Sequence, residues 1–61
     1  MKRKEFVRHL NNNQCLLKRE GGSHSVYLNI SNNKTSTVPR HNEINDYLVK
    51  KICKDLDIKA P

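Results

Sequence analysis

Apolar residues recur at helical spacing near the start of the chain. Between Arg3 and Asn12 the apolar side chains are Phe6, Val7 and Leu10, and charged or polar residues occupy the other positions. Apolar residues about one turn apart form a stripe along one side of a helix, and such a stripe packs against a core. A run of three asparagines ends the pattern, because their amides compete for backbone groups and tolerate left-handed geometry. These features predict a short amphipathic helix over residues 3–12.

Further along, the spacing of apolar residues changes to alternation. Residues 24–30 read HSVYLNI, in which a more apolar set alternates with a more polar set. Alternation with period two predicts a strand of an antiparallel sheet that has one face on the core and the other in water. By hydrophobicity, we expect the core-facing side chains to be Val26, Leu28 and Ile30. The solvent-facing set is then Ser25, Tyr27 and Asn29.

Two more strands flank this one. Residues 14–20 precede it and residues 34–38 follow it, with the sequences QCLLKRE and KTSTV. A glycine pair at 21–22 and an asparagine pair at 32–33 separate the three runs. Both pairs are of the type that supplies positive φ values in tight hairpins. The middle of the chain therefore predicts a three-stranded antiparallel meander.

A second helix follows the third strand. Pro39 ends that strand because proline has no N–H for the strand ladder, and Asn45 or Asp46 is suited to cap a helix. The apolar stripe of this helix consists of Leu48, Val49, Ile52, Cys53 and Leu56. The order of elements is therefore α-β-β-β-α, an α+β fold. The economical packing places the two helices side by side on one face of the sheet and leaves the other face in water.

The small size and the charge of the chain limit its partners. Its 61 residues suffice for one small domain with a thin core, since a chain of about 60 residues buries only about 60% of the surface that it exposes when unfolded. Lys and Arg number 12 against 6 Asp and Glu, a formal net charge of +6. We expect nucleic acid as the partner and no membrane, because both helices must turn their apolar faces to the core.

The cysteines and the N-terminus indicate a location for the protein. Cys15 and Cys53 occupy positions that otherwise carry apolar residues, and we expect two buried free thiols. The N-terminal sequence MKRKEFVRHL has the charge of a signal peptide but no apolar run behind it. We expect a cytosolic protein, where reducing conditions keep thiols free.

Metal and nucleotide sites have no supporting motif. Three histidines and two cysteines are present, but no CxxC, HxxxH or close Cys/His pair occurs, whereas structural zinc sites usually draw their ligands from short pairs. The glycine pair lacks the length and the lysine of a phosphate-binding loop. We expect no metal ion and no cofactor.

A histidine lies behind the glycine pair, in the sequence EGGSHSVY of residues 20–27. Gly21 and Gly22 allow a phosphate or ribose to approach the backbone closely, and Ser23 offers a hydroxyl and an N–H to a phosphate oxygen. An imidazole can accept the proton of a ribose 2′-hydroxyl at neutral pH, so His24 is a candidate for metal-independent RNA cleavage. Alternatively, His24 shares strand parity with Val26 and lies at the rim of the core, bonded to a carbonyl. The pattern alone leaves both interpretations open.

Several basic residues accompany this turn. We expect four of them to lie on the strands and loops near it and to neutralise an RNA backbone: Lys18, Arg19, Lys34 and Arg40. His41, which follows Arg40, is a candidate general acid or phosphate clamp, or else a solvated loop residue. His9 lies between apolar positions of the first helix and is expected to be structural or exposed.

The G-S-H triplet at residues 22–24 is followed by Tyr27, by TVPRH at residues 37–41, and by a basic last helix. In this order the motifs resemble those of the HicA-type toxins of bacterial toxin–antitoxin pairs, small RNA-cleaving proteins with a double-stranded-RNA-binding-domain-like α-β-β-β-α fold. The resemblance implies that residues 1–61 form a single HicA-like domain and that His24 is catalytic, with Gly22 and Ser23 shaping the turn. It also implies a HicB-like antitoxin that covers the RNA-binding face.

The chain departs from the family pattern in two places. Gln14 and Cys15 stand where many relatives have a glycine–aromatic pair, and residues 47–49 read YLV where relatives tend to have a Gly-Thr-Leu type of helix start. The chain also lacks the lysine-rich helix start with which true double-stranded-RNA-binding domains hold a duplex. We therefore expect single-stranded or locally open RNA as the substrate.

Three hypotheses for function follow. The first is a toxin that cleaves mRNA without a metal, with His24 as general base and Arg40, Lys18 or Lys34 stabilising the charge of the phosphorane. The second is an RNA-binding module without catalysis, and the third is a chain that acts only inside a protein complex. Composition does not separate these three.

Overall fold

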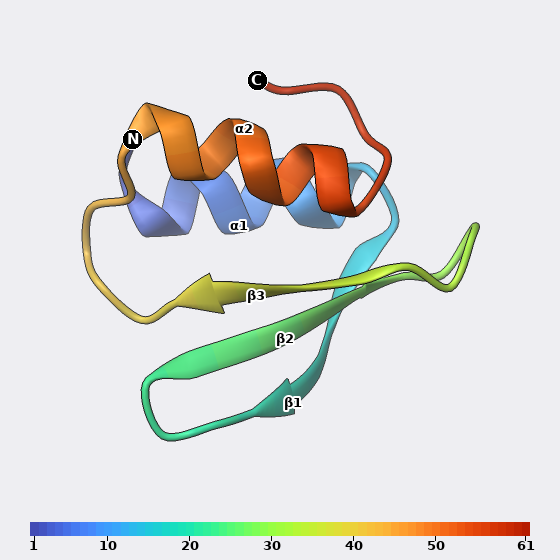
Figure 1. The fold of residues 1–61 in the computed structure, drawn as a ribbon, viewed down its shortest axis with the longest axis horizontal. Helices are drawn as coiled ribbons and strands as arrows, with labels where there is room; N and C mark the ends of the chain where they lie inside the picture. The colour runs from blue at the N-terminus through green and yellow to red at the C-terminus, as the bar shows by residue number, and fades with distance from the viewer.

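The structure, a computed structural model, describes all residues from Met1 to Pro61. Its elements are α1 (Arg3–Asn12), β1 (Cys15–Glu20), β2 (His24–Asn29), β3 (Thr35–Pro39) and α2 (Asp46–Asp55). The strands form one antiparallel sheet in the order β1-β2-β3. Both helices lie over the same face of the sheet (Figure 1); α1 contacts β1, and α2 contacts β3. The predicted α-β-β-β-α fold is confirmed.

Polar side chains mark where the helices begin and end. The Asn45 carboxamide accepts a hydrogen bond from the Leu48 N–H at 2.8 Å and caps α2, which selects Asn45 from the two predicted caps. At the end of α1, the Asn13 amide donates to the His9 carbonyl at 2.8 Å. The left-handed residue after α1 is Gln14, with a φ of 62°, and not one of the asparagines that precede it.

The core lies between the helices and the sheet. Its ten buried hydrophobic residues are Phe6, Leu10, Cys15, Tyr27, Val38, Ile44, Val49, Ile52, Cys53 and Leu56. Both cysteines are buried and free, as predicted. Burial raises the pKa of the Cys15 thiol and of the Cys53 thiol, so both remain protonated and pack as small apolar groups.

The two faces of β2 are opposite to the prediction. The buried side chains are Ser25, Tyr27 and Asn29, whereas Ile30 just beyond the strand is 54% exposed. The polar residues are buried because they find partners there: the Asn29 amide donates to the Leu56 carbonyl at 2.8 Å, a group that the end of α2 leaves without a helical partner. The more apolar set, including Val26, lies on the open face of the sheet.

The turns also differ from the prediction in one respect. Asn33 has a φ of 64°, as expected for the β2–β3 turn, but neither glycine of the β1–β2 turn has a positive φ. Gly21 is required for a different reason, since a Cβ at this position would lie 2.8 Å from the His24 carbonyl oxygen. A Cβ at Gly22 would meet no atom within 4 Å. The close approach of two backbone segments therefore requires a glycine at position 21 but not at position 22.

Neither helix has the length and the apolar character that are needed to cross a membrane. α1 and α2 have ten residues each, whereas a spanning helix needs about 20.

Candidate functional site

His24 is the first residue of β2, and its side chain is exposed. It shares the parity of Val26, as expected, but that parity belongs to the open face of the sheet and not to the core. Its imidazole makes no hydrogen bond within the chain. The interpretation of His24 as a carbonyl-bonded residue at the rim of the core was therefore wrong, and the ring is accessible to a ligand.

Three hydrogen bonds hold the turn before His24 in place. The Gly21 N–H donates to the His24 carbonyl at 2.8 Å, and the Arg40 N–H donates to the Ser23 carbonyl at 3.2 Å. The Arg40 guanidinium donates through Nη1 to the Gly21 carbonyl at 3.1 Å. Because Arg40 directly follows β3, these bonds fix the turn against the end of that strand. We call residues 19–24 together with Pro39 and Arg40 the His24 corner.

The sheet register determines which other side chains share this corner. His24 is opposite Pro39 on β3, and Val26 is opposite Arg19 on β1. Residues opposite each other in an antiparallel sheet project from the same face, so Arg19 and His24 both belong to the open face. Lys18 lies at a bulge between Leu17 and Arg19 and is exposed. The register therefore places Lys18 and Arg19 near the turn, as expected. Arg40 is also near the turn, because it is hydrogen-bonded to it.

Lys34 and His41 occupy different places. Lys34 lies in the β2–β3 turn, where its carbonyl accepts from the Asn29 N–H at 2.9 Å and its Nζ lies 3.9 Å from Asp57 Oδ2. It is at the end of β2 opposite to His24, about 16 Å away at about 3.3 Å per residue, so the expectation that it lies near the turn was wrong. His41 is exposed in the loop after Arg40.

A partly buried polar network supports the corner from the helix side. Arg3 donates through Nε to the Pro39 carbonyl at 2.9 Å and through Nη2 to Ser25 Oγ at 3.0 Å. The Ser25 hydroxyl in turn donates to Glu20 Oε1 at 2.5 Å. Arg3 therefore connects α1 to all three strands directly beneath His24. The sequence pattern did not indicate this network, because it assigned Ser25 to the solvent face and Arg3 to the exposed side of its helix.

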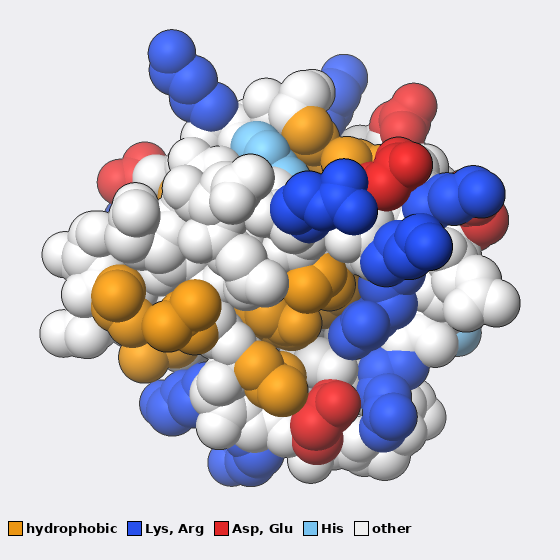
Figure 2. Space-filling view, turned by 180° about the vertical axis from the view of Figure 1, so that it is seen from behind, with side chains coloured by type: hydrophobic (Ala, Val, Ile, Leu, Met, Phe, Trp, Pro, Cys, Tyr) orange, Lys and Arg blue, Asp and Glu red, His pale blue; other side chains and the backbone are white.

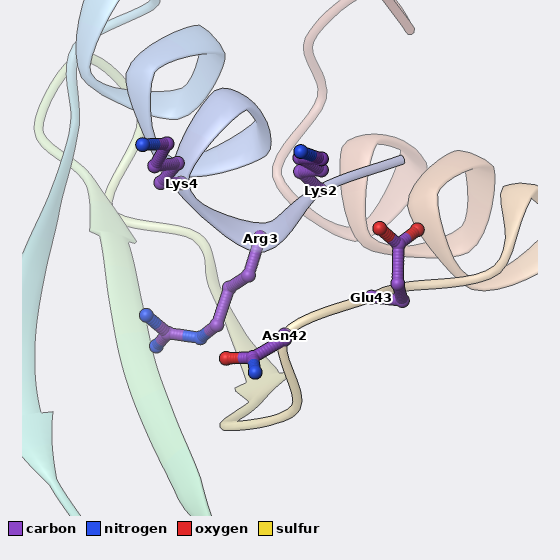
Figure 3. A pocket seen from close by; sticks show the side chains of 5 residues that line it. All are labelled: Lys2, Arg3, Lys4, Asn42 and Glu43. Atoms are coloured by element: carbon purple, nitrogen blue, oxygen red, sulfur yellow. The ribbon is translucent and has the colours of Figure 1, made fainter.

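The same arginine borders a shallow pocket beside the corner. The pocket lies between the start of α1 and the β3–α2 loop, and its lining residues are Lys2, Arg3, Lys4, Asn42 and Glu43 (Figure 3). The Arg3 side chain extends from it toward the sheet, away from Lys2 and Lys4 (Figure 3). Seen from behind, many Lys and Arg side chains gather toward this end of the molecule, whereas apolar side chains lie near the middle and toward the other end (Figure 2).

The structure contains no group of three His, Cys, Asp or Glu side chains that could hold a metal ion. Of the histidines, His9 has a structural role: its Nε2 lies 2.7 Å from the Lys59 carbonyl, and its ring stacks on Phe6 with centroids 6.4 Å apart. The side chains that can act on a ligand are therefore the exposed imidazole of His24 and the cations around it.

Comparisons with curated proteins and with solved structures find no match. A family model described as "HicA toxin of bacterial toxin-antitoxin" matches residues 3–58, from the first residue of α1 to beyond the end of α2. The match thus includes the His24 corner, both helices and the whole sheet, and the family implies an antitoxin as protein partner. The chain belongs to the HicA toxin family of bacterial toxin–antitoxin pairs.

Proposed function

We propose that this HicA toxin is a ribonuclease that cleaves mRNA without a metal ion and that His24 is its general base. The observation that carries the proposal is the exposed imidazole of His24 at a tight turn, between Arg19 on one neighbouring strand and Arg40 at the end of the other. A base between two cations is suited to act on a ribose next to a phosphate.

The reaction needs one base, one acid and a stabiliser of negative charge. His24 removes the proton from a ribose 2′-hydroxyl, the 2′-oxygen attacks the adjacent phosphorus, and the bond from phosphorus to the 5′-oxygen breaks. The leaving 5′-oxygen takes a proton from water or from a side chain such as His41. The products are a 2′,3′-cyclic phosphate, which can hydrolyse to a 3′-phosphate, and a 5′-hydroxyl.

Arg40 is the best placed cation for the phosphorane. Its Nη1 is engaged with the Gly21 carbonyl, which leaves further N–H donors of the guanidinium free and fixes the side chain against the turn. Lys18 and Arg19 border the same corner and serve the RNA backbone. Lys34 lies at the other end of β2, so it contacts the RNA backbone in this proposal and takes no part in stabilising the phosphorane.

The open face of the sheet is suited to unpaired bases. Its side chains next to the corner include Val26, Leu28 and Thr37, which pair across the strands with Arg19, Leu16 and Val26. Apolar side chains beside cations can contact the faces of unpaired bases, whereas a duplex hides those faces. We therefore infer single-stranded or locally open RNA as substrate, and a HicB-like antitoxin that blocks this face.

The proposal is tested by cleavage of a long unstructured RNA in excess EDTA, with the fragment ends mapped. Wild-type protein should cut and leave 2′,3′-cyclic or 3′-phosphate ends, and His24→Ala should cut roughly 100-fold to 10,000-fold more slowly. Circular dichroism should show the same fold for both. Fragments with 5′-phosphate ends would exclude this mechanism, and binding without cleavage by either protein would indicate an RNA-binding module.

A further inference from the structure

The outward side of α2 carries an exposed aromatic residue among lysines. Tyr47, Lys50, Lys51 and Lys54 are spaced by three, four and seven residues from the first, so they share one face of the helix, opposite the buried stripe of Val49 and Ile52. The four residues line one shallow pocket. We call them the α2 platform.

The Tyr47 ring has no partner within the chain. It is 80% exposed, more than any other large hydrophobic side chain of the protein. It forms no aromatic pair, since the one such pair is Phe6 with His9, and its hydroxyl makes no hydrogen bond to the chain. Both faces of the ring are therefore available to a flat ligand.

The lysines beside the ring are largely free as well. Lys51 is paired with Asp55, with Nζ and Oδ2 3.0 Å apart, whereas Lys50 and Lys54 form no ion pair. An exposed aromatic ring with free cations next to it on the same helix face is the composition of surfaces that hold single-stranded nucleic acid, in which a base stacks on the ring and the cations contact the backbone.

The platform begins at the same end of the molecule as the His24 corner. Figure 1 shows the β1–β2 turn, the end of β3 and the start of α2 at this end. The pocket lined by Lys2 and Lys4 lies on the β3–α2 loop between them (Figure 3). The molecule measures 27 × 25 × 16 Å, so one strand of several nucleotides can extend from the corner past this pocket to the platform.

We propose that the α2 platform is a second RNA-binding site, where a base of a single strand stacks on Tyr47 and the phosphates next to it contact Lys50 and Lys54. The inference deepens the proposed function and rests on it for the identity of the polyanion. A protein partner fits this surface less well, because cores of protein interfaces are depleted of charged side chains and Tyr47 is the sole apolar side chain among three lysines.

Tryptophan fluorescence reports on the platform directly, because the chain contains no tryptophan. The probe is a single-stranded oligonucleotide of about 12 nucleotides, within the usual range of site sizes, with 2′-O-methyl riboses that block cleavage by the proposed mechanism. The fluorescence of Tyr47→Trp should be quenched as the oligonucleotide binds, because a base stacks on the indole. Asn12→Trp, at the exposed C-terminal end of α1, is the matched control and should not change.

Affinity gives the second readout. Tyr47→Ala should bind the oligonucleotide about 5-fold to 150-fold more weakly, the range that corresponds to the stacking of one base, and Tyr47→Phe should bind like the wild type. Log affinity falls with log salt, and exchange of both Lys50 and Lys54 for glutamine should make this fall less steep, by about 0.7 in slope for each phosphate that is no longer neutralised.

The outcomes separate this inference from the proposed function. Quenching at Tyr47→Trp and weaker binding by Tyr47→Ala support the platform even if the wild type never cleaves RNA, in which case the nuclease proposal alone fails. Full affinity of Tyr47→Ala without quenching at Tyr47→Trp overturns the platform, even if cleavage is normal. A change in the fluorescence of Tyr47→Trp on binding of a protein partner, with no change on binding of RNA, also overturns it.

Discussion

Gly21 and Gly22 are neighbours with different structural roles. Gly21 donates its N–H to the His24 carbonyl at 2.8 Å, and its Cα lies so close to this carbonyl that a side chain has no room. Gly22 faces open space. The position of the catalytic imidazole in the proposed mechanism therefore depends on the first glycine and is indifferent to the bulk of the second.

The glycines provide a matched pair of variants. In Gly21→Ala the new methyl group displaces the His24 backbone, so we expect a loss of about 1–3 kcal/mol in the free energy of unfolding and a fall of at least about tenfold in RNA cleavage. Gly22→Ala should match the wild type in both. Chemical denaturation and initial cleavage rates measure the two effects, and equal behaviour of the two variants would contradict this role of Gly21.

The residues of the candidate site differ in how far the sequence predicts them. His24 and Arg40 lie close together because His24 begins β2, is opposite Pro39 on β3, and Arg40 directly follows Pro39. The motifs at residues 22–24 and 37–41 were therefore sufficient to predict that the two residues are near each other. Lys34 belongs to the turn at the other end of β2, so the length of that strand separates it from His24. Arg3 was missed because its partners are 22 and 36 residues away in sequence.

At the scale of elements, Arg3 joins α1 to the sheet beneath the His24 corner. Arg3→Met removes the bonds to Pro39 and Ser25, and we expect about 2 kcal/mol less stability and slower RNA cleavage, because the ends of β2 and β3 lose a common anchor. The control is Arg8→Met, since Arg8 is an exposed arginine of the same helix and makes no hydrogen bond or ion pair within the chain. Thermal unfolding and cleavage rates that are the same for both variants would show that Arg3 positions nothing.

Asp55 joins α2 to β3 and makes stability depend on pH. Hydrogen bonds from Lys51 and then from Ser36 hold the pKa of the Asp55 carboxyl below its ordinary value of 3.8. A carboxyl whose pKa is lower in the folded state adds stability above its unfolded pKa and loses it as the pH falls through the folded pKa. We expect the wild type to unfold at a higher temperature than Asp55→Asn at pH 7, with a smaller difference near pH 3. A difference that is the same at both pH values would contradict this linkage.

The elements themselves follow from the sequence, whereas the faces of β2 do not. Periodicity and the turn residues were sufficient for both helices and the three strands, because a thin core leaves few other ways to bury the helical stripes. Hydrophobicity assigned β2 to the wrong side, since the buried set includes Ser25 and Asn29. Their burial depends on partners from distant segments, Arg3 and Leu56, which a local pattern does not contain.

At the scale of the whole molecule, charge and exposed apolar surface lie in different places. The cations gather around the end that carries the His24 corner (Figure 2), which is consistent with RNA reaching that end first. Leu16 and Ile30 are exposed large hydrophobics that extend the apolar part of the sheet away from the corner. An antitoxin that covers both the cationic end and this apolar part of the sheet would block the proposed RNA site. It would also stabilise the folded toxin, with its small core, by mass action.

The central claim, that His24 deprotonates the 2′-hydroxyl next to the broken bond, is tested most directly by removing that hydroxyl. A mapped cleavage site is replaced by a single 2′-deoxynucleotide in an otherwise unchanged RNA, and cleavage by the wild type is followed in EDTA beside His24→Ala on the unmodified RNA. We expect cutting by the wild type to stop at the modified site and to continue at the other sites, and cutting by His24→Ala to be at least about 100-fold slower at every site. Continued cutting at the 2′-deoxynucleotide would contradict the claim.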